Sequence, residues 1–212
     1  MRIFLVGMAA FSLIFGLGNE LSAANIVTNG GFETGDSTGW TVHDCTVGCA
    51  TSPGPGWGVN AVNPQSGTYS AATPCTGSGC LDPVTGAYIS QILVTTAGDA
   101  YSLTFWSDAG TSTPSELDIF WDGSLVLAIP DGPVGYTQYT VSNLVATSAG
   151  TLLQFNGRQD PSTLYLDTVD VESTGVASPS PEPASLLLMA TALLGLGFAA
   201  TRRKACPARA RG

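Results

Sequence analysis

Short segments of alternating apolar and polar residues fill the middle of this 212-residue chain, and they restrict its fold more than any other feature. Successive side chains of a β-strand point to opposite faces, so a segment such as Tyr101–Phe105 buries one face and exposes the other. Turn residues separate these segments, and none has helical apolar spacing. The expected strands are residues 87–94, 100–107, 116–121, 124–129, 136–141, 151–156 and 164–171.

These strands predict one all-β domain, a β-sandwich, over residues 25–174. About 150 residues are enough for a single hydrophobic core. Asp122-Gly123 joins two of the strands and is typical of a type I′ hairpin.

The first 24 residues have the pattern of a secretory signal peptide. One basic residue, Arg2, precedes an apolar run from Ile3 to Leu17, and the small residues Ser22 and Ala24 precede the expected cleavage site. The protein is therefore expected to be exported.

Beyond the domain, the composition changes twice. Residues 175–183 form a linker rich in Pro and Ser, and residues 184–201 are uncharged and largely apolar. As a helix, these 18 residues would measure about 27 Å, which is sufficient to cross a bilayer. The tail, residues 202–212, is basic and is expected to stay in the cytoplasm, so the domain faces outward.

A Pro-Glu-Pro motif, an apolar segment and a basic cluster follow one another here, and this order resembles the PEP-CTERM sorting signal. The matching residues are Pro181, Glu182, Pro183, Arg202, Arg203 and Lys204. The resemblance implies processing by an exosortase in a Gram-negative bacterium that makes exopolysaccharide and biofilm matrix. It also implies transient anchoring in the inner membrane, followed by delivery to the cell surface or extracellular matrix.

The domain is strongly acidic. It contains fourteen Asp and Glu residues and a single basic residue, Arg158, which gives a net charge of −13. Nucleic-acid binding depends on Lys and Arg, which release counterions from phosphates. Nucleic acid is therefore excluded as a partner.

Four cysteines lie in the domain as two close pairs, Cys45 with Cys49 and Cys75 with Cys80. In an exported protein such cysteines form disulfides, and both the local pairing and a cross-linked pairing are open. A zinc site is the alternative, but the spacings are wider than those of zinc ribbons.

Three elements of the domain occur in the order found in carbohydrate-binding-module-like, or galactose-binding-like, jelly rolls. The first is Asn25–Gly35, which reads NIVTNGGFETG and is followed by Gly39-Trp40. The second is Gln65–Ser70, which reads QSGTYS, and the third is Tyr165–Val171, which reads YLDTVDV. The sequence resembles this family, which implies a jelly-roll fold.

The same resemblance implies a structural calcium ion held by Glu33 and Asp167, with carbonyl groups near Gly31 and Gly67 as further ligands. Calcium takes six to eight oxygen ligands, and a close pair of carboxylates suits it. Thr168 stands where the family has a second Asp. In the alternative interpretation, Glu33 faces solvent and Asp167 caps a strand.

Aromatic side chains are the candidate sugar-binding residues. Trp57 lies in a Pro- and Gly-rich loop, Trp106 lies on the strand face opposite Phe105, and Phe120 lies on the face opposite its neighbour Trp121. We predict that Trp57, Trp106 and Phe120 bind ligand.

Catalysis has little support in the sequence. The single histidine, His43, is expected in a solvated loop without a nucleophile motif, and the many acids do not single out a glycosidase pair. We therefore expect a non-catalytic surface or matrix protein that binds exopolysaccharide. The alternatives are a structural or adhesive matrix protein without sugar specificity, and an exported glycan hydrolase.

Overall fold

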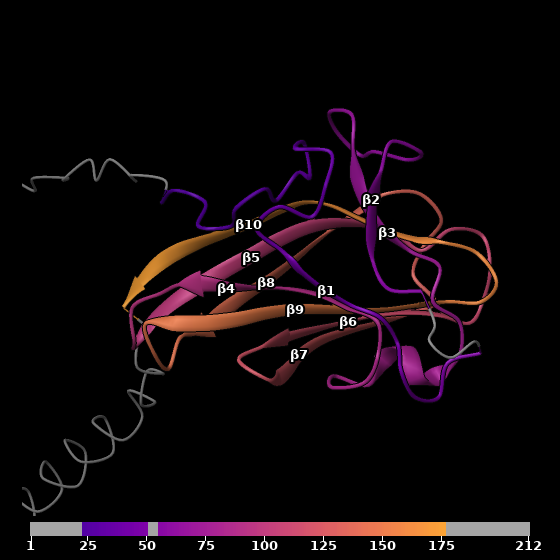
Figure 1. Cartoon of the computed structure of the whole chain (residues 1–212). Helices are drawn as coiled ribbons and strands as arrows, with labels where there is room; N and C mark the ends of the chain where they lie inside the picture. The colour runs from indigo at the N-terminus through magenta and orange to yellow at the C-terminus, as the bar shows by residue number, and fades with distance from the viewer. Residues whose placement is uncertain (1–22, 51–54, 177–212) are drawn as a thin grey trace, which may run out of the picture.

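The computed structural model describes residues 23–50 and 55–176, which form a two-layer β-sandwich (Figure 1). It confirms the all-β jelly-roll prediction. Most of the predicted signal peptide, the sorting residues, the apolar segment and the basic tail lie outside the described residues. Within the described ranges, no helix has the length and apolar character needed to cross a bilayer.

Each sheet has five antiparallel strands. The first sheet has the order β1 (Thr41–His43), β4 (Tyr88–Val94), β9 (Gly150–Gln159), β6 (Ser115–Trp121) and β7 (Ser124–Pro130). The second sheet has the order β2 (Gly58–Asn60), β3 (Ser70–Thr73), β10 (Leu164–Val176), β5 (Asp99–Asp108) and β8 (Thr137–Val145). A single turn of 3-10 helix, η1 (Ser78–Leu81), lies between β3 and β4.

The seven predicted strands correspond to β4 through β10. Asp122 and Gly123 have φ angles of 50° and 78°, as a type I′ turn requires, so the predicted hairpin is confirmed. β10 continues to Val176, two residues beyond the predicted end of the domain. The short strands β1, β2 and β3 were not predicted.

The core lies between the two sheets and is built from alternate residues of the long strands. Leu103 and Phe105 of β5 are fully buried, as are Phe155 of β9 and Leu166 of β10. The Phe105 and Phe155 rings meet edge to face, with centroids 5.3 Å apart. The strand periodicity read from the sequence therefore places the core correctly.

The two ends of the sandwich differ. At one end, the segment between β3 and β4, residues 74–87, lies across the outer face of the first sheet; we call it the strap (Figure 1). Asn156 donates a hydrogen bond to the Asp82 carbonyl oxygen (2.8 Å), and Gln154 donates one to that of Pro83 (2.9 Å). We call the end of the sandwich that carries the strap the strap end. The opposite end, where β10 finishes, is the exit end.

Candidate functional site

The predicted ligand-binding residue Trp57 lies in the core, with only 4% of its surface exposed. Its indole N–H donates to the Ala87 carbonyl oxygen (3.3 Å). Gly157 leaves room for the ring, because a Cβ there would lie 2.7 Å from Trp57 Cζ2. The prediction that Trp57 binds ligand is wrong, because the chain turns the ring inward, into space that a glycine leaves open, where a sugar cannot stack on it.

Trp106 and Phe120 lie on opposite outer faces of the sandwich. Trp106 is half-buried on the outer face of the second sheet, whereas Phe120 is on the outer face of the first sheet and only 8% exposed. The structure therefore does not bring the three predicted ligand-binding residues together into one site.

Trp106 belongs to a polar outer surface of the second sheet, which we call the Trp106 face. Across the sheet its neighbours in register are Asp167 of β10 and Gln138 of β8. Along β5, Thr104 and Ser102 point to the same side as Trp106, at steps of about 7 Å. A cavity of about 130 Å³ on the same outer face is lined by Ser102, Thr104, Asp170 and Glu172, and Thr104 is two residues from Trp106 along β5.

Two carboxylates of β10 give this cavity its chemistry. Asp170 pairs in register with Thr104, and Glu172 pairs with Ser102, so two acids face two hydroxyls. Burial, and then repulsion from Glu172, raise the pKa of Asp170. The Oδ1 atom of Asp170 is buried without a hydrogen-bond partner among the described residues. A ligand hydroxyl would satisfy this acceptor.

The predicted calcium ligands, Glu33 and Asp167, both bind the turn that precedes β3. Glu33 accepts hydrogen bonds from the backbone N–H groups of Thr68 and Tyr69, all at 3.0 Å. Gly67 has a φ of +63°, and a Cβ there would lie 2.5 Å from the Glu33 carboxyl carbon. The carboxylate and the glycine are therefore closely fitted.

Asp167 is fully buried and contacts the same turn from the other side. It accepts from the backbone N–H groups of Gln65 (2.8 Å), Ser66 (3.2 Å) and Thr168 (2.6 Å). Burial raises the pKa of Asp167, and these hydrogen bonds act in the opposite direction.

Each of the four oxygens of Glu33 and Asp167 thus accepts at least one N–H group. These N–H contacts occupy lone pairs that a calcium ion, which requires six to eight oxygen ligands, would otherwise use. The calcium site stays a prediction.

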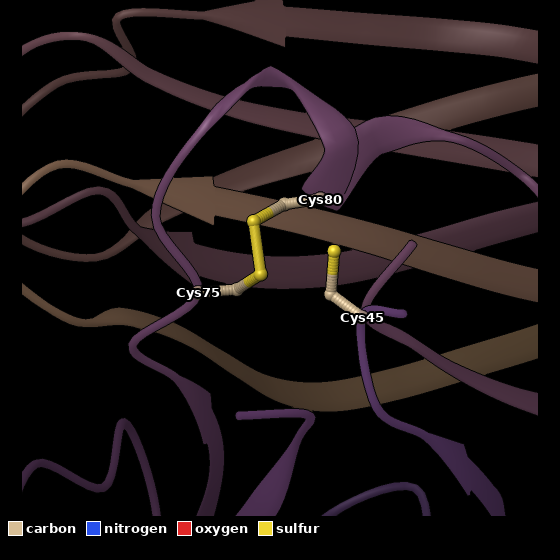
Figure 2. A group of neighbouring side chains, drawn as sticks. All are labelled: Cys45, Cys75 and Cys80. Carbon is tan, nitrogen blue, oxygen red and sulfur yellow. A yellow bond between two sulfur atoms is a disulfide. The ribbon is translucent and has the colours of Figure 1, made fainter. Parts of the chain in front are cut away.

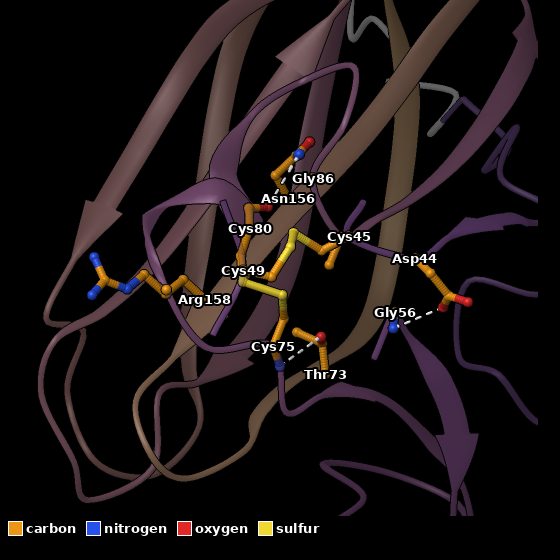
Figure 3. Close-up of a disulfide and its surroundings, with 12 residues drawn as sticks. Asp44, Cys45, Cys49, Gly56, Thr73, Cys75, Cys80, Gly86, Asn156 and Arg158 are labelled. Carbon is orange, nitrogen blue, oxygen red and sulfur yellow. Dashed lines mark hydrogen bonds between the residues drawn. A yellow bond between two sulfur atoms is a disulfide. The ribbon is translucent and has the colours of Figure 1, made fainter. Parts of the chain in front are cut away.

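The four domain cysteines lie together: Cys75 and Cys80 belong to the strap, and Cys45 and Cys49 pack against them. The structure contains the local pairing, Cys45–Cys49 and Cys75–Cys80, of the two that the sequence left open (Figure 3). Figure 2 shows the Cys45 sulfur pointing toward the Cys75–Cys80 bridge. The sulfurs of Cys45, Cys75 and Cys80 lie within 4.8 Å of one another, and all three residues are buried. Since every sulfur is in a bridge, this cluster leaves no thiolate to bind a metal.

Two polar features of the first sheet were missed by sequence reasoning. His43 lies in β1 rather than in a loop: its ring stacks on Tyr88, with centroids 4.6 Å apart, and Nδ1 lies 2.9 Å from the Gly86 carbonyl oxygen. Asp118 of β6 is 8% exposed, and its Oδ1 has no partner within the described part of the chain. Burial, and then repulsion from Glu116, raise the pKa of Asp118 to about 6.

Residues 181–204 match the model of the PEP-CTERM protein-sorting motif. The chain therefore carries a PEP-CTERM protein-sorting motif. The match covers all six predicted sorting residues and indicates export. No curated protein matches the chain.

Solved structures similar to this chain share its fold. TmCBM61, solved in complex with β-1,4-galactotriose, is 14% identical, with 71% of this chain and 99% of that chain covered and a TM-score of 0.51. The tandem CBM22-1–CBM22-2 domain of Xyn10C from Paenibacillus barcinonensis is 16% identical over 76% of this chain and 49% of that chain, with a TM-score of 0.52. A cyclase from Fischerella sp. TAU is 17% identical over 74% of this chain and all of that chain, with a TM-score of 0.50. The jelly-roll fold therefore occurs in both binding modules and an enzyme.

Proposed function

We propose that this protein is anchored in the inner membrane as a precursor, is then sorted to the cell surface or matrix, and there binds exopolysaccharide through the Trp106 face without catalysis. The observation that carries the proposal is the half-buried Trp106 ring on the same outer face as a cavity that holds two carboxylates and two hydroxyls. The similar folds of modules named for carbohydrate binding support the same substrate class.

The chemistry of the Trp106 face suits a sugar. The apolar C–H face of a pyranose stacks on an indole ring, while its hydroxyls need acceptors nearby. Asp170 and Glu172 supply charged acceptors, and hydrogen bonds to ionised groups are about twice as strong as neutral ones. Ser102 and Thr104 can both donate and accept. Asp170 Oδ1 is buried and has no hydrogen-bond partner among the described residues, so a hydrogen bond from a ligand hydroxyl would stabilise it most.

Glycan binding by the purified exported protein tests the proposal. Trp106→Ala should weaken binding about 5- to 140-fold, if a sugar ring stacks as strongly as a nucleic-acid base, for which the loss is about 1–3 kcal/mol. Trp106→Phe should retain part of the affinity, and Leu125→Ala, on the opposite outer face, should retain all of it. Equal binding by wild type and Trp106→Ala would contradict this site.

The same preparation separates the alternatives. An intact fold that binds no glycan would favour a structural or adhesive matrix protein. Release of new reducing ends from exopolysaccharide, abolished by Asp170→Asn or Glu172→Gln, would favour a glycan hydrolase, since glycosidases use two carboxylates.

A further inference from the structure

An aliphatic patch covers the exit end of the first sheet on its outer face. Val94 and Ile92 of β4 are 83% and 73% exposed, and Leu125 of β7 is 54% exposed. Ile92 pairs in register with Leu152 of β9, and Leu125 pairs with Phe120 of β6. Ile92, Val94, Leu125 and Leu152 thus lie on the outer face of the first sheet, whereas Phe120 between Leu152 and Leu125 is only 8% exposed. An exposed apolar patch of this kind marks an interaction surface.

An apolar groove continues the patch around the edge of the sandwich. It has a volume of about 430 Å³ and lies between β7 and β8, where Trp121, Val126, Leu144 and Val145 provide its apolar lining. At this groove, the Trp121 indole N–H donates a hydrogen bond to the Val145 carbonyl oxygen (3.0 Å). Val145 itself is 44% exposed.

The chain leaves the domain beside this patch. Val176, the last residue of β10, pairs with Asp99, which follows Val94 by five residues. Only seven residues, 177–183, separate Val176 from the apolar segment 184–201. Fully extended, seven residues reach about 25 Å. A membrane that binds residues 184–201 would therefore lie within about 25 Å of the exit end.

The exit end also carries little charge. Of the fourteen acids of the domain, the loops at residues 95–99, 121–124 and 145–150 contain only Asp99 and Asp122. The strap end and the Trp106 face carry most of the others. A weakly charged, aliphatic surface is suited to the boundary between headgroups and acyl chains, whereas a strongly acidic one would be repelled by anionic lipids.

We propose that the exit end rests on the bilayer in the anchored precursor, with Ile92, Val94, Leu125 and Leu152 in contact with lipid. The inference rests on the membrane anchoring in the proposed function and adds an orientation to it. In this orientation the Trp106 face lies beside the bilayer, with its cavity open. Release by processing would free the patch from lipid.

Tryptophan quenching in liposomes tests this orientation. The full precursor is reconstituted in phosphatidylethanolamine–phosphatidylglycerol vesicles with acyl-chain-brominated lipid, as Leu125→Trp and, for control, as Val84→Trp. Val84 is 73% exposed but lies in the strap, at the opposite end of the sandwich from the patch. The emission added by Leu125→Trp should be quenched at least about twofold more than that added by Val84→Trp. Equal quenching overturns the proposal.

A second pair of variants tests whether the extra quenching depends on the aliphatic patch. Ile92→Asp with Val94→Asp, in the Leu125→Trp background, should abolish the extra quenching, whereas Val84→Asp should leave it unchanged. Failure of the precursor to float with the vesicles would instead refute the anchoring itself. Co-flotation without extra quenching, together with crosslinking of two chains through the patch, would overturn the lipid contact in favour of a second copy.

Discussion

The two ends of the sandwich are covered very differently. At the strap end, connecting segments lie over both outer faces: the strap covers Asn156 and Gln154 on the first sheet, and the Gln65–Tyr69 turn covers Asp167 on the second. Both disulfides are there as well. At the exit end, the outer faces of the two sheets are exposed, and that of the first sheet is aliphatic. Covalent and polar crosslinks are thus concentrated at the end remote from the sorting signal.

This difference predicts that substitutions at the strap end reduce stability far more than those at the exit end. The largest effect is expected for the Cys75–Cys80 bridge. Replacing both cysteines by Ser should reduce the free energy of unfolding by about 3 kcal/mol, because the closed loop is released and two buried positions become polar. Urea denaturation measures the loss. The matched double Ser variant at Cys45 and Cys49 should lose less, because Cys49 is only half-buried; the reverse order would contradict the buried cluster.

The Gln65–Tyr69 turn provides the second test. Asp167→Asn should reduce the free energy of unfolding by about 2 kcal/mol, because a buried acceptor of three N–H groups loses its charge and one acceptor oxygen. Glu33→Gln, at an exposed position, should lose about half as much. Equal losses would show that burial at Asp167 does not matter.

Chelation separates the two interpretations of this turn. From the N–H contacts we expect EDTA to leave the unfolding midpoint of the wild type unchanged. A midpoint that rises on addition of calcium to chelated protein, and does not rise in Asp167→Asn, would support the calcium ion that the family resemblance implies.

Asp118 allows a test by pH. Its pKa is raised to about 6 from 3.8, so the folded state holds the proton more tightly than the unfolded state. The stability that this group contributes is complete below about pH 4 and is lost as the pH rises to about 6. Between these limits the wild type should lose about 1–2 kcal/mol more than Asp118→Asn does. Denaturation at several pH values measures this, and parallel pH profiles of the two proteins would refute it.

The smallest effect is expected at the exit end. Val94→Asp should change the free energy of unfolding by no more than about 0.5 kcal/mol, since its side chain is 83% exposed and contacts little protein. Thermal unfolding in the absence of membrane provides the measurement. A loss comparable to that of the cysteine variants would remove the contrast between the two ends.

The long strands were predictable because alternation is written in their own residues, as in β5, where Leu103 and Phe105 point inward and Trp106 outward. The buried position of Trp57 was not predictable, because the space for its ring is left by Gly157, a hundred residues away. That glycine within a strand was the available signal. Nor could local pattern reveal that the strap crosses β9, because those contacts join residues more than 70 positions apart.

The sorting motif was predictable because it is linear: its recognition elements follow one another in the chain. The Trp106 face is the opposite case. Trp106 was a candidate from the sequence, but its cavity needs β5 and β10 side by side. The pairing of Asp170 with Thr104 depends on a register that shifts between Asp167 and Asp170. No sequence pattern specified that shift.

The place of β10 has a consequence for the timing of export. It is the last strand of the domain, yet it lies in the middle of the second sheet, between β3 and β5. A chain translocated from its N-terminus therefore leaves this sheet split into two unjoined parts until residue 176 has emerged. In the proposed anchored precursor, the apolar segment 184–201 follows within a few residues, so the fold would be completed as the membrane stop arrives.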